Sequence, residues 1–255
     1  MSGSLPEMGS WDAVFDGTYL QTYLPMLDDE RTRVEALGAV ALAEVEPGGE
    51  ILDCPVGVAR HAILLTEEGY RVTGLDRSST QLAEAERRRG DAEWPTLVHG
   101  DYRQLPFADD SFDAVLTLFS SLGYLERDED CGVLRELRRV LRPGGALIVE
   151  TAHRDALARF ARPRGWRTWD RLPDGSLFLQ EQEVDWAAGT TSNLHLIVAA
   201  DGRRTERRYI LHVYSVKEWT EMLCASGFAS VETFAGWDDP SPATPESWRL
   251  IIRAR

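Results

Sequence analysis

Two aspartates, each directly after a short apolar run, are the best candidates in this chain for binding chemistry. The first run ends at Asp53, and a tight turn with Pro55 and Gly57 then leads into an apolar helix; the second run ends at Asp76. In a strand–turn–helix–strand unit, an acidic residue in the position of Asp76 accepts hydrogen bonds from the hydroxyls of a ribose. The carboxylate of Asp53, at the mouth of the turn, disfavours a pyrophosphate and favours a cation.

At this turn the chain resembles the class I S-adenosylmethionine (SAM) dependent methyltransferases, in which an acidic residue is followed by G-x-G-x-G. The three glycine positions read Pro55, Gly57 and Ala59, so two of them are replaced. Pro55 loses an N–H group but keeps the carbonyl that faces the SAM ammonium in the family. Gly57 keeps the position at which positive φ matters most, and Ala59 adds one methyl group. The resemblance therefore implies an altered but usable SAM loop.

The resemblance also implies roles for residues outside the turn. Asp76 would hold the ribose, Asp101 would bind the adenine amino group or serve as a plain turn residue, and Tyr102 would pack on the ring. An aromatic N-terminal helix would cover the cofactor as a lid, or only pack on the sheet. The expected cofactor-binding residues are Tyr19, Tyr23, Asp53, Pro55, Gly57, Asp76, Arg77, Asp101, Tyr102, Leu118 and Phe119. The implied cofactor is SAM, with S-adenosylhomocysteine as its product.

Methyl transfer from a sulfonium depends mainly on proximity and alignment, and a hydroxyl or ammonium acceptor also needs a base. Two histidines are predicted to be catalytic: His153, just beyond the fifth strand, and His212, on a later strand. Each could instead be a packing residue. The residues expected to bind the substrate are Tyr124, Trp166, His195 and Tyr214. No His/Cys cluster has zinc-ligand spacing, so we expect no metal.

The elements that must position these residues predict an α/β fold. We expect a doubly wound, mostly parallel, seven-stranded Rossmann-like sheet with an N-terminal helical cap and an inserted antiparallel β-meander. The insertion is predicted to contain three strands, over residues 177–186, 193–200 and 207–214. The expected parts are 1–49, the helical cap; 50–151, the SAM-binding core; 152–214, the antiparallel insertion or substrate lid; and 215–255, the C-terminal helix and final strand pair.

Composition and charge narrow the function further. A hydrophobic content of 43% is enough for a core, and a net charge of −14 suits nucleic-acid binding poorly. No apolar run is long enough to span a membrane, and the N-terminus has no apolar signal segment. The three cysteines are far apart, as in reduced intracellular proteins. We therefore expect a cytoplasmic monomer or homodimer that acts on a small molecule and not on nucleic acid or a membrane.

The predicted function is SAM-dependent methylation of an oxygen or nitrogen of a small molecule, such as a secondary metabolite. One alternative is a SAM-binding protein of the same fold that does not methylate and is cyclase-like or regulatory; the altered glycine loop motivates it. Another is an NAD-dependent oxidoreductase, although a turn with one glycine offers few backbone amides to a pyrophosphate. A methyltransferase acting on protein or nucleic acid is a further alternative.

Overall fold

The computed structural model describes residues 15, 17–160 and 165–255 of the 255-residue chain. The first part of the expected helical cap, residues 1–14 and 16, lies outside the described residues. The remainder of the cap is helical, as predicted. Its elements are α2 (Gly17–Tyr23), a single 3₁₀ turn (Leu24–Met26) and α3 (Asp29–Ala43).

The central sheet has seven strands in the order β10-β11-β5-β4-β1-β2-β3. Strand β11 runs antiparallel to both of its neighbours, and every other neighbouring pair is parallel. This confirms the predicted doubly wound, mostly parallel sheet. The strands are β1 (Glu50–Asp53), β2 (Arg71–Asp76), β3 (Thr96–His99), β4 (Phe112–Thr117), β5 (Leu141–Ala152), β10 (Val231–Phe234) and β11 (Arg249–Ala254).

Helices cover both faces of this sheet, so the strands are apolar on both sides. Successive strand residues point to opposite faces: Ile51 packs with α3, α4 and α5, and Leu52 packs with α6 and α8. Both side chains are fully buried. The helices are α4 (Arg60–Glu67), α5 (Ser79–Arg89), α6 (Arg127–Val140), α7 (Arg154–Phe160) and α8 (Val216–Ala225).

A second sheet is inserted between α7 and α8. It is antiparallel, as predicted, but it has four strands and not three, in the order β6-β7-β8-β9. The strand that the sequence analysis missed is β6, an edge strand that is mostly exposed and carries tryptophan and arginine without an apolar alternation. The strands are β6 (Trp166–Arg171), β7 (Leu177–Asp185), β8 (Thr190–Val198) and β9 (Arg204–His212).

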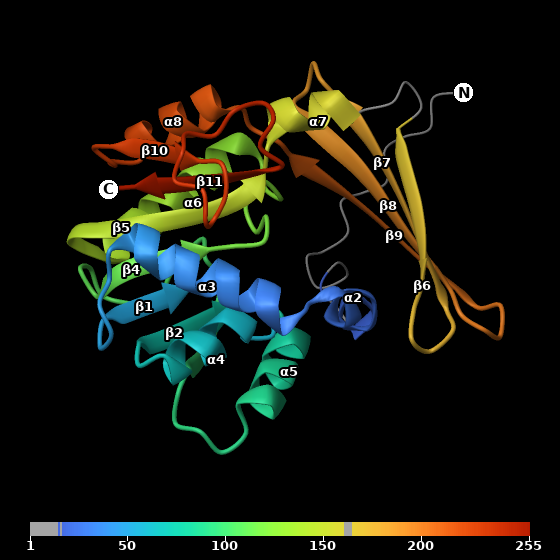
Figure 1. Cartoon of the computed structure of the whole chain (residues 1–255), viewed down its shortest axis with the longest axis horizontal. Helices are drawn as coiled ribbons and strands as arrows, with labels where there is room; N and C mark the ends of the chain where they lie inside the picture. Colours follow the sequence, from blue (N-terminus) through green and yellow to red (C-terminus); the bar gives the residue numbers. More distant parts are fainter. Residues whose placement is uncertain (1–14, 16, 161–164) are drawn as a thin grey trace.

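The second sheet stands beyond the edge at which β1 and β5 end, and α2 lies between the two sheets (Figure 1). Several contacts join it to the core, among them a backbone hydrogen bond and a ring contact. The backbone N–H of His212 donates to the carbonyl of Gly123 at 2.7 Å, and the Phe178 ring lies 5.9 Å from the Tyr23 ring, centroid to centroid. The insertion therefore faces the carboxyl ends of the parallel strands, where such sheets bind their ligands.

Candidate active site

Two adjoining pockets, here named the first and second pockets, lie at the carboxyl ends of β1, β2 and β4. Their empty volumes, open solvent included, are about 600 and 700 Å³. Phe15, Pro55, Asp76 and Ser121 line both pockets, so the two form one continuous site. Every residue expected to bind the cofactor lines one pocket or the other.

Asp76 ends β2 at the junction of the two pockets. Its carboxylate accepts hydrogen bonds from the backbone N–H groups of Gly57 and Ser78, both at 2.8 Å. Burial raises the pKa of Asp76, although these hydrogen bonds oppose the shift. The backbone N–H of Arg77 acts on the carboxylate in the same sense. A carboxylate has about four lone-pair sites, so at least one remains for a ligand. This geometry fits the expected role of Asp76 in binding a ribose diol.

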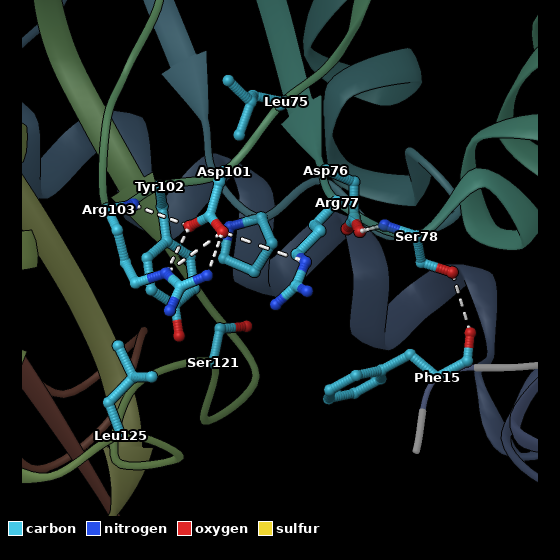
Figure 2. Close-up of a pocket in the computed structure, with 12 residues that line it drawn as sticks. Phe15, Leu75, Asp76, Arg77, Ser78, Asp101, Tyr102, Arg103, Ser121 and Leu125 are labelled. Atoms are coloured by element: carbon cyan, nitrogen blue, oxygen red, sulfur yellow. Dashed lines mark hydrogen bonds and ion pairs between the residues drawn. The ribbon is translucent and has the colours of Figure 1, made fainter. Parts of the chain in front are cut away.

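Asp101 follows β3 and lies at the opposite wall of the first pocket (Figure 2). Arg103 donates from Nε and Nη2 to its carboxylate at 3.0 and 2.6 Å, and the Nε atom of Arg77 lies 3.8 Å away. Partial burial raises the pKa of Asp101, but the hydrogen bonds from Arg103 outweigh it and the net shift is downward. Asp101 is therefore ionised and fixed in place, and Tyr102 beside it lines the same pocket.

The turn between β1 and α4 keeps the shape of a nucleotide loop despite its two replaced glycines. Gly57 has φ 55° and Ala59 has φ 59°, both in the left-handed region. The N–H of Val56 donates to the carbonyl of Leu75 at 2.8 Å, which ties the turn to β2. At Gly74 a side chain would clash, because an added Cβ would lie 2.5 Å from a methyl carbon of Val56.

We expect Ala59→Gly to change little. The left-handed conformation costs a non-glycine residue about 1–2 kcal/mol. Removing that cost is offset by the loss of a buried methyl group, worth about 0.8 kcal/mol, and by the entropy of glycine, about 0.5–1 kcal/mol. The free energy of unfolding should change by less than about 1 kcal/mol, and SAM affinity by less than about tenfold. Denaturant unfolding and calorimetry with SAM measure both. A large gain in affinity would mean that the natural loop is impaired, and would favour a protein that does not methylate.

Asp53 carries the unusual electrostatics of the site. It is 1% exposed and lines the second pocket, and its Oδ2 atom has no hydrogen-bond partner in the described part of the chain. Burial raises the pKa of this carboxyl to about 8; the charge of Arg60 lowers it and that of Asp76 raises it. A buried carboxylate with an unsatisfied oxygen fits a cationic ligand group, such as the ammonium of SAM.

Aromatic side chains close the second pocket. Tyr19 and Tyr23 of α2 stack with their ring centroids 4.5 Å apart. Phe119, in the loop after β4, has φ 60°, and its N–H donates to a carboxylate oxygen of the buried Glu150 at 2.9 Å. Three guanidinium groups lie 5.2–5.7 Å from the Phe119 ring centroid, within cation–π distance; they belong to Arg31, Arg60 and Arg249.

A buried ion network supports the pocket from behind. Glu35 of α3 accepts from Arg31 at 2.6 Å, lies 2.5 Å from Nη2 of Arg60, and is 3.0 Å from Nε2 of His61. Burial raises the pKa of Glu35, but these partners outweigh it and lower the pKa to about 2. Burial lowers the pKa of His61 to about 4, so this imidazole is neutral near pH 7. The network fixes the first turn of α4 beside the cofactor loop.

We expect Glu35→Gln to destabilise the fold by about 2 kcal/mol at pH 7, because breaking a buried pair leaves Arg60 without its counter-charge. The stabilisation is present above the unfolded pKa of about 4.5 and is lost as pH falls through the folded pKa of about 2. Urea unfolding measures it. Glu206→Gln is the control, because its pair with Arg208 has both side chains 50% exposed. Equal effects of the two substitutions would contradict a structural role for the network.

One histidine of the second sheet joins the aromatic wall. The Nε2 atom of His195 lies 3.4 Å from the Tyr23 hydroxyl and 3.3 Å from the Tyr209 hydroxyl. The Tyr209 ring lies 5.9 Å from that of Tyr124, which lines the second pocket. Burial, together with the charge of Arg207, lowers the pKa of His195 to about 4, so the ring is neutral at physiological pH. A neutral imidazole between two hydroxyls can accept a proton.

The other sequence-predicted residues lie elsewhere. His153 and Trp166 together line a third pocket, between the end of β5 and the second sheet. Tyr214 is buried in the core, where its hydroxyl donates to Asp130 at 2.8 Å, and His212 stacks on it at 6.2 Å between ring centroids. Neither His212 nor Tyr214 lines the first or second pocket.

Three contributors were not among the predicted site residues. Tyr209 is a half-buried residue of β9 between the exposed Arg208 and the half-buried Ile210, and this pattern gives no signal of its own. Arg60 directly follows the glycine loop, and this position could have indicated a pocket residue. Arg103 lies two residues after Asp101, a spacing at which side chains of a turn can meet.

Within residues 15, 17–160 and 165–255, no group of three or more His, Cys, Asp or Glu side chains is arranged to hold a metal ion. A search of the same residues finds no helix with the length and apolarity needed to cross a bilayer.

Known proteins resemble this chain in sequence and in fold. Residues 51–145 match the family described as methyltransferase domain. A demethylmenaquinone methyltransferase of Beutenbergia cavernae is 31% identical over 207 residues, which cover 81% of this chain and 70% of that protein. The CcbJ methyltransferase from Streptomyces caelestis superposes with a TM-score of 0.77 at 23% identity, covering 90% of this chain and 98% of that one. SAM-bound CalS10, an amino pentose methyltransferase from Micromonospora echinaspora, gives 0.70 at 19%, with all of both chains covered.

The sequence relatives extend well beyond the glycine loop, and the pockets at the carboxyl ends of the strands fit the parts of SAM. Asp76 and Asp101 suit its nucleoside, and the unsatisfied oxygen of Asp53 suits its ammonium. The chain therefore belongs to the class I SAM-dependent methyltransferases, and it transfers a methyl group from SAM.

Proposed function

We propose that the acceptor is a small molecule methylated at a nitrogen or an oxygen, and that it reacts in the second pocket beside His195. The observation that carries this proposal is the triangle of His195, Tyr23 and Tyr209, with both hydroxyls within 3.4 Å of the imidazole Nε2 atom. Tyr23 lines the second pocket, so the triangle adjoins the place where a methyl acceptor would lie.

The chemistry requires one proton acceptor. A lone pair of the acceptor atom forms the new bond to the methyl carbon, while the sulfur–methyl bond breaks and its electron pair stays on sulfur. The acceptor proton passes to Nε2 of His195, directly or through the hydroxyl of Tyr23 or Tyr209. Burial raises the pKa of Tyr23 to about 12 and also raises that of Tyr209, so both hydroxyls keep their protons and can relay one.

The catalytic roles expected for His153 and His212 stay predictions. His212 does not line the second pocket and stacks on the buried Tyr214, and His153 lies in the third pocket with a side chain that is 1% exposed. Neither approaches the cofactor-side aromatic residues as His195 does. We therefore assign the base to His195 in preference to both, and we include all three in the test below.

In this proposal the two sheets have different roles. Residues 50–151 would bind SAM, and 152–214 would bind and align the acceptor, with 1–49 and 215–255 completing the site and the sheet. The net charge of −14 supports an acceptor other than a nucleic acid. A cytoplasmic location and a monomeric or homodimeric state complete the proposal.

A second candidate acceptor is a quinone-like ring. The relative at 31% identity is named for demethylmenaquinone, and the aromatic walls of the second pocket could stack on such a ring. In this case the methyl group would be transferred to a carbon atom of the ring, while the SAM site would be unchanged.

The test uses SAM with a ¹³C-labelled methyl group and fractionated small-molecule extracts. We expect a labelled product whose carbon chemical shift is that of an N-methyl or O-methyl group. A C-methyl shift would favour the quinone-like acceptor. Labelled protein or nucleic acid with no labelled small molecule would overturn the proposal.

A further inference from the structure

The third pocket, here named the tryptophan pocket, is a separate hollow walled by aromatic residues. Trp166, Trp186 and Trp248 line it, from β6, from the turn after β7 and from just before β11. Its empty volume is about 1040 Å³. These side chains are 40%, 41% and 61% exposed. Exposed tryptophans gathered around one hollow favour a planar ligand, because ring stacking recovers the apolar area they leave in water.

The polar groups of the tryptophan pocket indicate which chemical groups its ligand carries. Arg249 supplies a cation, Gln182 an amide, and none of the described lining residues is a carboxylate. The Arg249 guanidinium approaches Glu150 only at 3.4 Å and Ser120 at 3.5 Å, so it keeps donors for a ligand. The net charge of the chain is −14, but this lining contains an arginine and no carboxylate. It therefore complements an anionic or carbonyl oxygen.

His153 gives a second indication that a ligand belongs here. Its Nδ1 atom lies 3.0 Å from the carbonyl of Ser247, and a carbonyl only accepts, so Nδ1 carries the proton. The Nε2 atom then accepts a hydrogen bond in the neutral ring and donates one in the imidazolium. It is buried, has no hydrogen-bond partner in the described part of the chain, and is 3.9 Å from the Asp155 carboxylate. A buried polar atom without a partner is rare in a folded protein, and a polar group of a ligand would satisfy it.

The tryptophan pocket adjoins the proposed reaction site. Arg249 lines the tryptophan pocket, and its guanidinium lies 5.7 Å from the Phe119 ring centroid. It also donates to the Ser120 hydroxyl at 3.5 Å. Phe119 and Ser120 both line the second pocket. The two hollows are therefore neighbours near Arg249, and an extended acceptor could occupy both.

We propose that the tryptophan pocket binds a planar aromatic ring bearing an anionic or carbonyl oxygen, and that this ring is the distal part of the methyl acceptor. Only the second half of this statement rests on the proposed function. The tryptophans hold the faces of the ring, and Arg249 holds its oxygen. The pocket thereby sets which acceptors reach the methyl group, without contact to SAM.

The probe is 2-naphthoate, and its binding to the full chain saturated with S-adenosylhomocysteine is followed by calorimetry and by ligand-observed NMR. Trp166→Ala and Trp186→Ala should each weaken binding by at least about tenfold. Trp169→Ala is the matched control: this residue is on the same strand as Trp166 and is 66% exposed. Residues three apart on a strand point to opposite faces, so it should leave binding unchanged. The cation 2-naphthylmethylammonium should bind at least about tenfold more weakly than 2-naphthoate.

Three results would overturn the proposal: no binding of 2-naphthoate, equal effects of Trp166→Ala and Trp169→Ala, or displacement of S-adenosylhomocysteine by the probe. The last would place the ring in the second pocket. Thermal unfolding of each variant shows whether it is folded, and Trp186→Ala tests the same pocket from the turn after β7. No methyl transfer is measured, so a failure of the proposed function, seen as absent small-molecule labelling, is distinguishable from a failure here.

Discussion

His195→Ala is expected to lower turnover by at least about a hundredfold, the usual scale for losing a general base, while SAM affinity stays within a few fold. The imidazole is the basic group of the triangle, because burial lowers the pKa of His195 to about 4, so that its ring is neutral near pH 7, and keeps both tyrosine hydroxyls protonated. Its Nε2 atom accepts when Nδ1 carries the proton of the neutral ring. The measurement is the rate of ¹³C-methyl transfer to the acceptor found with labelled SAM, together with calorimetry of SAM binding.

Two controls separate a base from a packing residue. Tyr209→Phe keeps the ring that packs near Tyr124 and removes only the hydroxyl, so it should lower turnover less than His195→Ala does. His212→Ala removes an imidazole of the same sheet that stacks on the buried Tyr214, outside the triangle, and it should have little effect. Added imidazole should restore part of the activity of His195→Ala, which it cannot do for a merely structural defect.

The dependence of the methyl-transfer rate on pH is an independent test of His195 as the base. Protonation of His195 removes its lone pair, so the wild-type rate should be flat near neutral pH and fall as pH drops through about 4. In His195→Ala the acceptor must lose its proton to water, and the residual rate should rise with pH. Full turnover in His195→Ala combined with a large loss in His153→Ala would return the role to the residue that the sequence analysis favoured.

The cofactor half of the site was predictable because its signals are local. Asp53 and Asp76 are each the last residue of a buried strand, and a glycine turn lies between the strands, so a few neighbouring residues specify the geometry. The parallel sheet then brings the strand ends together. Asp101 was predicted after β3 in the same way. The sequence did not indicate that Arg103 would form a bidentate pair of hydrogen bonds with the Asp101 carboxylate.

The acceptor half could not be predicted in the same way. The contact between Tyr23 and His195 joins residues 172 positions apart, and no local pattern encodes which histidine of a strand will meet a helix of the cap. Strand β6 was missed because an exposed edge strand needs no apolar alternation. Tyr214 was expected on the last strand of the insertion, facing the cleft, whereas β9 ends at His212 and the buried Tyr214 hydroxyl donates to Asp130. Its role in binding the substrate stays a prediction.

Asp53→Asn is expected to have opposite effects on stability and on cofactor binding. Burial raises the pKa of Asp53 to about 8, so the fold is destabilised increasingly as pH rises from the unfolded pKa of about 4 toward 8. Asparagine does not titrate and avoids this cost. The variant should match the wild type near pH 4 and exceed its free energy of unfolding by on the order of 2–4 kcal/mol at pH 8. Urea unfolding across this pH range measures the difference.

The same substitution should weaken SAM binding by about 10–100-fold at pH 8, because a hydrogen bond to a charged group contributes roughly 1.5–3 kcal/mol. Wild-type affinity should rise with pH up to about 8, as Asp53 loses its proton, and the affinity of Asp53→Asn should be nearly flat. 5′-Methylthioadenosine lacks the ammonium and is the control ligand, so its affinity should be the same for both proteins. Equal weakening of both ligands would mean that Asp53 shapes the loop and does not bind the ammonium. If Asp53→Asn is more stable but binds SAM as tightly as the wild type, the unsatisfied Oδ2 atom of Asp53 does not bind the ammonium. Another group of the second pocket would then bind it.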